Sequence, residues 1–133
     1  MKNKFKYLDV TAKGVAAFIM LQTLYFKFSA SPESVYIFST IGMEPEGRIG
    51  SGIGELIASI LILVPKTTWL GAMGAIGLMS GAIFFHLTSI GIVVMDDGGQ
   101  LFIYACLVFL SALYLLIRNK EIPLALIFNR KSK

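Results

Sequence analysis

This chain of 133 residues is poor in the residue types that build metal centres and thiol-based active sites. It has one cysteine, Cys106, and one histidine, His86. A single cysteine forms neither an internal disulfide nor a Cys-x-x-Cys redox pair. The two residues together cannot build an ordinary zinc site, and haem ligation by two histidines is excluded. No Gly-x-Ser-x-Gly, P-loop or dinucleotide-binding pattern is present. We therefore predict no metal site, no catalytic residue and no self-sufficient catalytic motif.

Charged residues are also scarce. They make up 15% of the chain, against about 25% in a soluble domain. Hydrophobic residues make up 56%, and the mean hydropathy is +0.75. The formal net charge of +4 could suggest a nucleic-acid partner, but the basic residues flank apolar runs and form no patch interleaved with aromatics. The composition predicts a protein of the lipid bilayer with no nucleic-acid partner.

Four apolar segments approach the roughly 20 residues that a helix needs to cross a bilayer. They are residues 11–28, 49–64, 68–94 and 100–117. We predict an all-α membrane protein, a single domain folded as a four-transmembrane-helix bundle. Cytoplasmic termini (N-in/C-in) and a cytoplasmic turn at 65–67 place ten of the twelve Lys and Arg residues inside, as the positive-inside rule favours. Residues 118–133 would then form a basic cytoplasmic tail, with Ile122–Phe128 along the inner interface.

The outer loop between the first two segments carries a helix-start pattern. Ser31-Pro32-Glu33 supplies an N-cap residue, a proline at the first helical position and an acid in the first turn. Val35, Phe38 and Ile41 follow at helical spacing, and Gly42 is a plausible stop. We expect a short amphipathic helix at the outer mouth of the bundle.

Glu55 is the most informative residue, because it lies within the second apolar segment. An ionised group at a helix centre costs roughly 2.5–3.5 kcal/mol even on the lenient insertion scale. Such a group usually has a partner, and Lys27, Arg48 and His86 are the candidates. Lys27 could pair with Glu55 or extend its ammonium to the interface, and Arg48 could join the cluster or contact lipid headgroups.

The predicted topology places these polar groups in one leaflet. At 1.5 Å per residue, Glu55 lies about 9 Å from the outer end of its segment, and His86 about 27 Å from the inner start of its own. The small-residue faces Gly50-xxx-Gly54-xxx-Ala58 and Gly74/Gly77/Gly81 allow close helix approach, so both side chains could face a shared interior. We predict six ligand-binding residues: Lys27, Arg48, Glu55, His86, Gln100 and Tyr104.

The chain resembles the DoxX-like family of small four-span membrane proteins. The resemblance covers residues 12–117 and rests on Lys27, the stretch 41–48, the Gly-x-x-Glu55-Leu pattern before Pro65, and a glycine-rich segment ending near His86. It implies a polar core of Lys27, Glu55 and His86. It also implies a link to quinol oxidase and thiosulfate:quinone oxidoreductase complexes, in which a partner would supply the redox centre. We expect the protein in the cytoplasmic (inner) membrane of a bacterium.

Three functions remain open on this basis. The favoured one is a binding or accessory subunit of a membrane oxidoreductase system, with a quinone or a lipid as its ligand and a redox enzyme as its partner. It predicts one cavity that contains both Glu55 and His86. The second is a structural or assembly protein whose polar core only fixes helix packing. The third is a small transporter, which would require a homo-oligomer.

Overall fold

The computed structural model describes residues 5–119, in which helices are joined by turns and loops and no strand is present. A 3-10 turn, Pro65–Thr67, precedes α4, and a π-helical turn, His86–Ile90, follows it. The five helices are α1 (Lys6–Phe28), α2 (Pro32–Thr40), α3 (Glu46–Leu63), α4 (Thr68–Phe85) and α5 (Gln100–Arg118).

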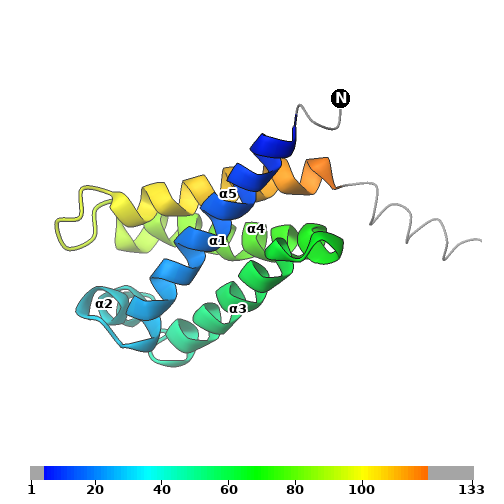
Figure 1. Ribbon diagram of the computed structural model, residues 1–133. Helices are drawn as coiled ribbons and strands as arrows, with labels where there is room; N and C mark the ends of the chain where they lie inside the picture. The colour runs from blue at the N-terminus through cyan, green and yellow to red at the C-terminus, as the bar shows by residue number, and fades with distance from the viewer. Residues whose placement is uncertain (1–4, 120–133) are drawn as a thin grey trace, which may run out of the picture.

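The four long helices form a bundle in which each packs against two neighbours. α1 and α4 each contact both α3 and α5. The short helix α2 and the loop between α4 and α5 lie at one end of the bundle, here called the α2 end (Figure 1). The start of α1, the 3-10 turn and the end of α5 lie at the opposite end (Figure 1).

Helix α2 confirms the short helix predicted in the loop after the first segment. Ser31 is its N-cap, and the Ser31 hydroxyl oxygen accepts a hydrogen bond from the backbone N–H of Ser34 at 3.3 Å. Pro32 occupies the first turn, where its missing N–H costs no hydrogen bond. α2 packs against α1, α3 and the π-helical turn, so it closes one end of the bundle.

Helices α3 and α4 approach each other closely at Gly71. A Cβ atom built on Gly71 would lie 2.6 Å from the backbone nitrogen of Ile62 and 2.7 Å from the carbonyl oxygen of Ala58. The predicted small-residue stripes are only partly right, because Cβ atoms on Gly50, Gly77 and Gly81 would meet nothing within 4 Å. Ala58 and Gly74 do face each other, with 3.8 Å between the Ala58 Cβ and a Cβ built on Gly74.

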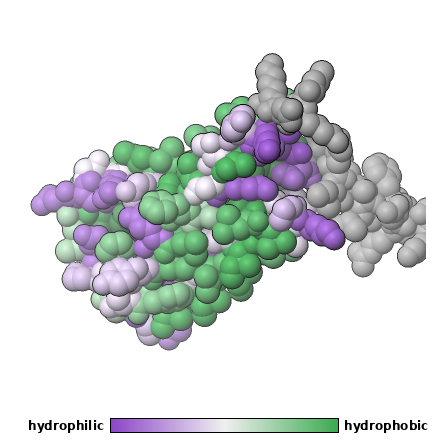
Figure 2. Space-filling model, in the orientation of Figure 1, coloured by the Kyte–Doolittle hydropathy of each residue, from purple (hydrophilic) through white to green (hydrophobic). Residues whose placement is uncertain are grey.

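The outer surface of the bundle is apolar along each long helix. Phe18 on α1, Ile57 on α3, Phe84 on α4 and Leu110 on α5 are all more than half exposed. Figure 2 shows this apolar surface between hydrophilic patches at the two ends of the bundle. Within residues 5–119, the segments Pro65–Ile90 and Gln100–Arg118 are long and apolar enough to cross a bilayer.

The observed helices differ from the predicted segments at their ends. α1 begins at Lys6 and α3 at Glu46, ahead of the predicted 11 and 49. The helical part of the predicted segment 68–94 ends at Ile90, because Gly91 has a φ of +90° and leaves the helical region. Arg118 ends α5, and the rest of the predicted tail, from 120 on, lies outside the described residues.

An ion pair joins the start of α1 to the end of α5. The Tyr114 hydroxyl donates to Asp9 Oδ1 at 2.9 Å, and Arg118 Nε donates to the same oxygen at 3.2 Å. Arg118 Nη2 donates to the other carboxylate oxygen, Asp9 Oδ2, at 3.3 Å. Asp9 is therefore held as the carboxylate, and its contacts connect the first and last long helices.

Candidate functional site

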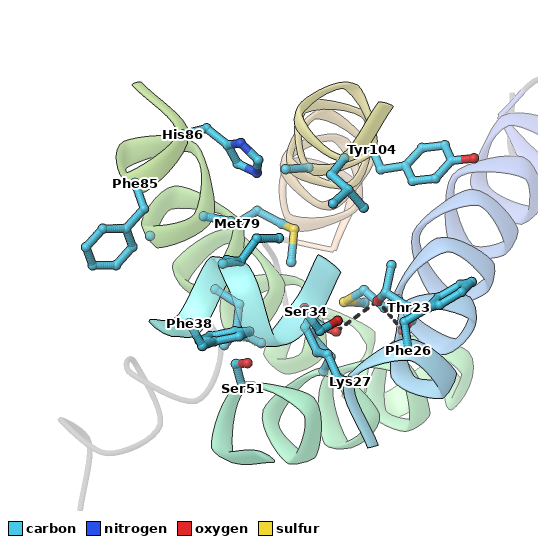
Figure 3. Close-up of a pocket in the computed structure, with 18 of the residues that line it drawn as sticks. Thr23, Phe26, Lys27, Ser34, Phe38, Ser51, Met79, Phe85, His86 and Tyr104 are labelled. Atoms are coloured by element: carbon cyan, nitrogen blue, oxygen red, sulfur yellow. Dashed lines mark hydrogen bonds and ion pairs between the residues drawn. The ribbon is translucent and has the colours of Figure 1, made fainter. Parts of the chain in front are cut away.

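A cavity of about 460 Å³ lies at the α2 end of the bundle. All five helices and the π-helical turn contribute to its walls, which are mainly apolar (Figure 3). The aromatic and sulfur-containing residues in the walls include Met20, Phe26, Phe38, Met79 and Phe85. The polar and charged residues in the walls are Gln22, Thr23, Lys27, Glu33, Ser34, Ser51, Glu55, His86, Gln100 and Tyr104.

Glu55 meets Lys27 inside this cavity. Lys27 Nζ lies 2.5 Å from Glu55 Oε1, and the Thr23 hydroxyl donates to Glu55 Oε2 at 3.1 Å. Both charged side chains are enclosed, with 16% of the Lys27 side chain and 6% of the Glu55 side chain exposed. Lys27 was expected either to pair with Glu55 or to extend its ammonium to the interface, and in the structure it pairs with Glu55. Thr23 lies one helical turn before Lys27 on α1, so one face of α1 supplies both partners.

Arg48 is not among the residues that line the cavity. Its Nε lies 2.9 Å from Glu44 Oε1, and its Nη1 donates to the carbonyl oxygen of Lys27. Carbonyl groups in the last turn of a helix lack an intrahelical donor, and a basic side chain can supply one. In this structure Arg48 therefore ties α3 to the end of α1, and its predicted ligand contact has no support from its position.

His86 lines the cavity from the opposite wall (Figure 3). It is the first residue of the π-helical turn and is 5% exposed. Its Nδ1 lies 2.9 Å from the carbonyl oxygen of Gly91, and its ring packs edge-on against Phe102 at 5.7 Å between centroids. His86 makes no hydrogen bond to Glu55, so the two residues share a cavity without forming a pair.

Gln100 and Tyr104 also line the cavity from the start of α5, where Gln100 Nε2 donates to the Tyr104 hydroxyl oxygen at 2.7 Å. Sequence analysis did not single out Glu33 and Ser34 of α2 or Ser51 of α3 as site residues. The signal for Ser51 was its place one turn before Glu55 on the same helix face. Glu33 and Ser34 line the cavity only because α2 lies over the end of the bundle, and no sequence pattern predicts that position.

The loop between α4 and α5 is organised around Asp97. Its Oδ1 accepts hydrogen bonds from the backbone N–H groups of Val94 at 2.9 Å and Gly99 at 2.8 Å. Its Oδ2 accepts from the N–H of Leu101 at 3.2 Å, within the first turn of α5. Burial raises the pKa of Asp97, these three hydrogen bonds and a smaller effect of His86 lower it, and the net shift is downward. Asp97 therefore acts as a carboxylate that caps α5.

Replacing Asp97 by asparagine should lower the free energy of unfolding by about 1–2 kcal/mol, a typical loss for a weakened helix cap. Because the folded-state pKa lies below the ordinary value of 3.8, the carboxylate's contribution is present above that value and is lost as the pH falls through the lowered pKa. Thermal unfolding in detergent, measured from neutral pH down to about pH 3, checks this. A stability difference between wild type and Asp97→Asn that persists unchanged to the lowest pH would contradict it.

The arrangement provides few kinds of chemistry. Within residues 5–119, no three His, Cys, Asp or Glu side chains lie together in a way that could hold a metal ion. The cavity offers one ammonium–carboxylate pair, one imidazole, and hydroxyl and amide groups on apolar walls. Such a set can orient the polar head of a mostly apolar molecule by hydrogen bonds.

Comparison with known proteins gives one result. The model of the DoxX-like family matches residues 11–113, which is most of the chain. Searches among curated proteins and solved structures found no match. The matched range reaches into all five helices and contains every residue that lines the cavity. Together with the apolar helices, this match shows that the chain is a membrane protein of the DoxX-like family.

Proposed function

We propose that this protein binds a small amphipathic molecule inside the bilayer, with a quinone or a lipid as the ligand class, and serves as the binding subunit of a membrane oxidoreductase system. One observation carries the proposal. The Lys27–Glu55 pair and His86 line a single cavity of about 460 Å³ from opposite walls. Ligand sites in proteins are typically ~300–1,000 Å³, mainly apolar, with a few convergent polar groups.

The proposal includes four membrane spans. α3 exposes Ile53, Ile57 and Ile60 to the outside and turns Glu55 inward. α1 likewise exposes Phe18, while its Lys27 reaches Glu55. In water, apolar faces on all four long helices would be an association hazard, whereas in lipid they are the expected surface. At ~1.5 Å per residue, the 18–23 residues of α1, α3 and α5 span about 27–35 Å, which matches the ~30 Å hydrocarbon core.

The orientation is proposed from the distribution of basic residues. Lys66 in the 3-10 turn, Lys13 near the start of α1 and Arg118 at the end of α5 lie toward the end opposite α2. Under the positive-inside rule that end is cytoplasmic, and the cavity then lies in the outer half of the membrane. The bacterial cytoplasmic membrane is the proposed location.

The redox role is proposed through a partner. A quinone carries the electron chemistry itself, and the protein would contribute binding and orientation. His86 and Lys27 present hydrogen-bonding groups to the cavity, and Phe26, Phe38 and Phe85 provide apolar contact for a ring and its chain. A partner enzyme would deliver or remove the electrons, because the described residues offer groups for binding alone.

A structural role is the second candidate, and one observation favours it. The Glu55 carboxylate is already satisfied by Lys27 and Thr23, as a group that only fixes helix packing would be. The cavity argues the other way, because a bundle held together for packing alone fills its interior to near crystal density. Filling the cavity separates the two functions.

Gly81→Leu is expected to reduce the amount of co-purifying ligand about tenfold, because overpacking a site costs ~1–3 kcal/mol. Gly81 lines the cavity, and a Cβ on it meets nothing within 4 Å. Native mass spectrometry and organic extraction of protein purified in mild detergent measure the bound compound. The matched control is Gly50→Leu, because Gly50 is exposed on α3, away from the cavity, and is equally unhindered.

Both variants should keep a cooperative thermal transition, since a Cβ atom at either position meets nothing within 4 Å. Equal ligand content in wild type, Gly81→Leu and Gly50→Leu would count against the cavity as a binding site. It would instead favour the structural role.

A further inference from the structure

The two nitrogens of the His86 ring have different roles, and the backbone decides which is which. Nδ1 lies 2.9 Å from the carbonyl oxygen of Gly91. A carbonyl oxygen only accepts hydrogen bonds, so Nδ1 must carry a proton and donate it. In a neutral imidazole the other nitrogen, Nε2, is then an acceptor.

Nε2 reaches the cavity without a protein partner. None of residues 5–119 forms a hydrogen bond with it, although the residue is 95% enclosed, with 5% of its surface exposed. In the same range no side-chain nitrogen or oxygen is both fully covered and unpaired, so Nε2 must touch open space. His86 lines the cavity, and Figure 3 shows its ring directed into it.

The ring is also held in place. It makes an edge-on contact with Phe102 and a hydrogen bond to Gly91, whose φ of +90° ends the π-helical turn. A π-helical turn often marks a functional position. Holding one ring nitrogen on a backbone carbonyl is a common way to set the tautomer that the other nitrogen presents.

The opposite wall has the complementary character. The Lys27 ammonium only donates hydrogen bonds, and its contact with Glu55 occupies one of its three N–H groups. The cavity therefore presents a fixed acceptor, His86 Nε2, on one wall, and the Lys27 ammonium beside the Glu55 carboxylate on the other. A carbonyl or ether oxygen next to Nε2 could not pair with it, because both atoms only accept hydrogen bonds. Leaving a polar group unpaired is costly in an apolar cavity.

We propose that His86 makes this cavity selective for a ligand whose head group donates a hydrogen bond, a phenol or hydroquinone in preference to the corresponding quinone or methyl ether. The proposal rests on the proposed binding function and adds the protonation and redox state of the head group. A site built to pair with a hydroxyl group rejects the analogue without it far more strongly than an apolar pocket rejects an extra methylene.

Three ligands of nearly equal shape test this: a short-chain alkyl benzoquinone, its hydroquinone and the hydroquinone dimethyl ether. Equilibrium dialysis uses the full chain in detergent, without oxygen and at mildly alkaline pH. We expect the hydroquinone to bind about tenfold more tightly than either of the others, the effect of one well-placed hydrogen bond.

Two substitutions separate the two ring nitrogens. His86→Asn places an amide nitrogen near the position of Nδ1, so the donor to Gly91 is kept and the acceptor is lost; the hydroquinone preference should fall to about twofold or less. His86→Gln places an amide oxygen near the position of Nε2, so part of the preference should return. Thr88→Val is the matched control, because Thr88 lies on the same turn, is exposed and does not line the cavity.

The outcomes are distinct. Equal binding of all three ligands by wild type, or an undiminished preference in His86→Asn, would overturn the role of Nε2 and leave the cavity as a binding site. No binding of any ligand by wild type, together with unchanged ligand content in Gly81→Leu, would overturn the binding function and the selectivity with it. Thermal unfolding of His86→Asn close to wild type would show that the turn is intact.

Discussion

Lys27→Met is expected to lower the free energy of unfolding by about 3–5 kcal/mol, because it leaves a buried carboxylate without its cation. Lys27 Nζ lies 2.5 Å from Glu55 Oε1, and Glu55 is 4% exposed. After the substitution, the Thr23 hydroxyl would be the remaining side-chain donor to Glu55. Methionine keeps the length of the lysine stem, so the lost charge is the main change. Thermal or denaturant unfolding in detergent measures the loss.

Removing both charges should be far milder. Replacing a buried ion pair by apolar residues of similar size is often neutral or stabilising. We therefore expect Lys27→Met/Glu55→Leu to unfold within about 1 kcal/mol of wild type, giving a large coupling energy in the double-mutant cycle. A double variant as unstable as Lys27→Met alone would show that the two side chains do not act as a pair.

The same double variant also separates structure from function. If it keeps both its stability and its co-purifying ligand, the pair only holds α1 against α3. If it keeps its stability and loses the ligand, the ammonium or the carboxylate contacts the ligand directly. The second result is the expected one, because both side chains line the cavity. Lys27→Met alone cannot give this answer, since loss of fold would remove the ligand as well.

Several features of the site could be predicted from residue positions. Counting residues along helices of known rise predicts that Glu55 and His86 lie at a similar depth in the bundle. In the structure both residues line one cavity. The short helix after Ser31 followed from its N-cap and proline. The DoxX-like resemblance, drawn from Lys27, Glu55 and the glycine-rich third segment, agrees with the family match over residues 11–113.

The choice of partner for Glu55 could not be predicted in this way. Lys27 and Arg48 both lie at the α2 end of the bundle, and only the rotation of α1 and α3 decides between them. In the structure Arg48 instead pairs with Glu44, one turn away on its own chain segment, and with the carbonyl of Lys27. The end of the third helix was also missed, because apolar residues continue to 94 although Gly91 has already left the helical conformation.

Span prediction shows a related difficulty. By composition, the segments Pro65–Ile90 and Gln100–Arg118 qualify as spans. The proposed four spans also include α1 and α3, whose Lys27 and Glu55 face inward, and a hydropathy average cannot distinguish an inward charge from an outward one. Glu55 lowers the mean hydropathy of α3 although Ile53 and Ile57 cover its outer surface. The packing of the helices was needed to separate the two faces.

The glycines of α4 look alike in the sequence, and the structure separates them by their surroundings. Gly71 lies against the backbone of α3, and Gly81 borders the cavity. Gly71→Ala is expected to lower the free energy of unfolding by about 3 kcal/mol, the upper part of the usual range for overpacking. The new Cβ would lie 2.6 Å from Ile62 N and 2.7 Å from Ala58 O, and backbone atoms within a helix cannot move aside singly.

The matched control lies one turn further along α4. A Cβ at Gly74 would lie 3.8 Å from the Cβ of Ala58, an ordinary contact distance, so Gly74→Ala should change stability by less than about 1 kcal/mol. Thermal unfolding of both variants in one detergent gives the comparison, and equal stability would contradict the close approach at Gly71.

If α3 and α4 separate as expected, Glu55 also shifts relative to His86. Gly71→Ala should then lose ligand although it lies outside the cavity wall.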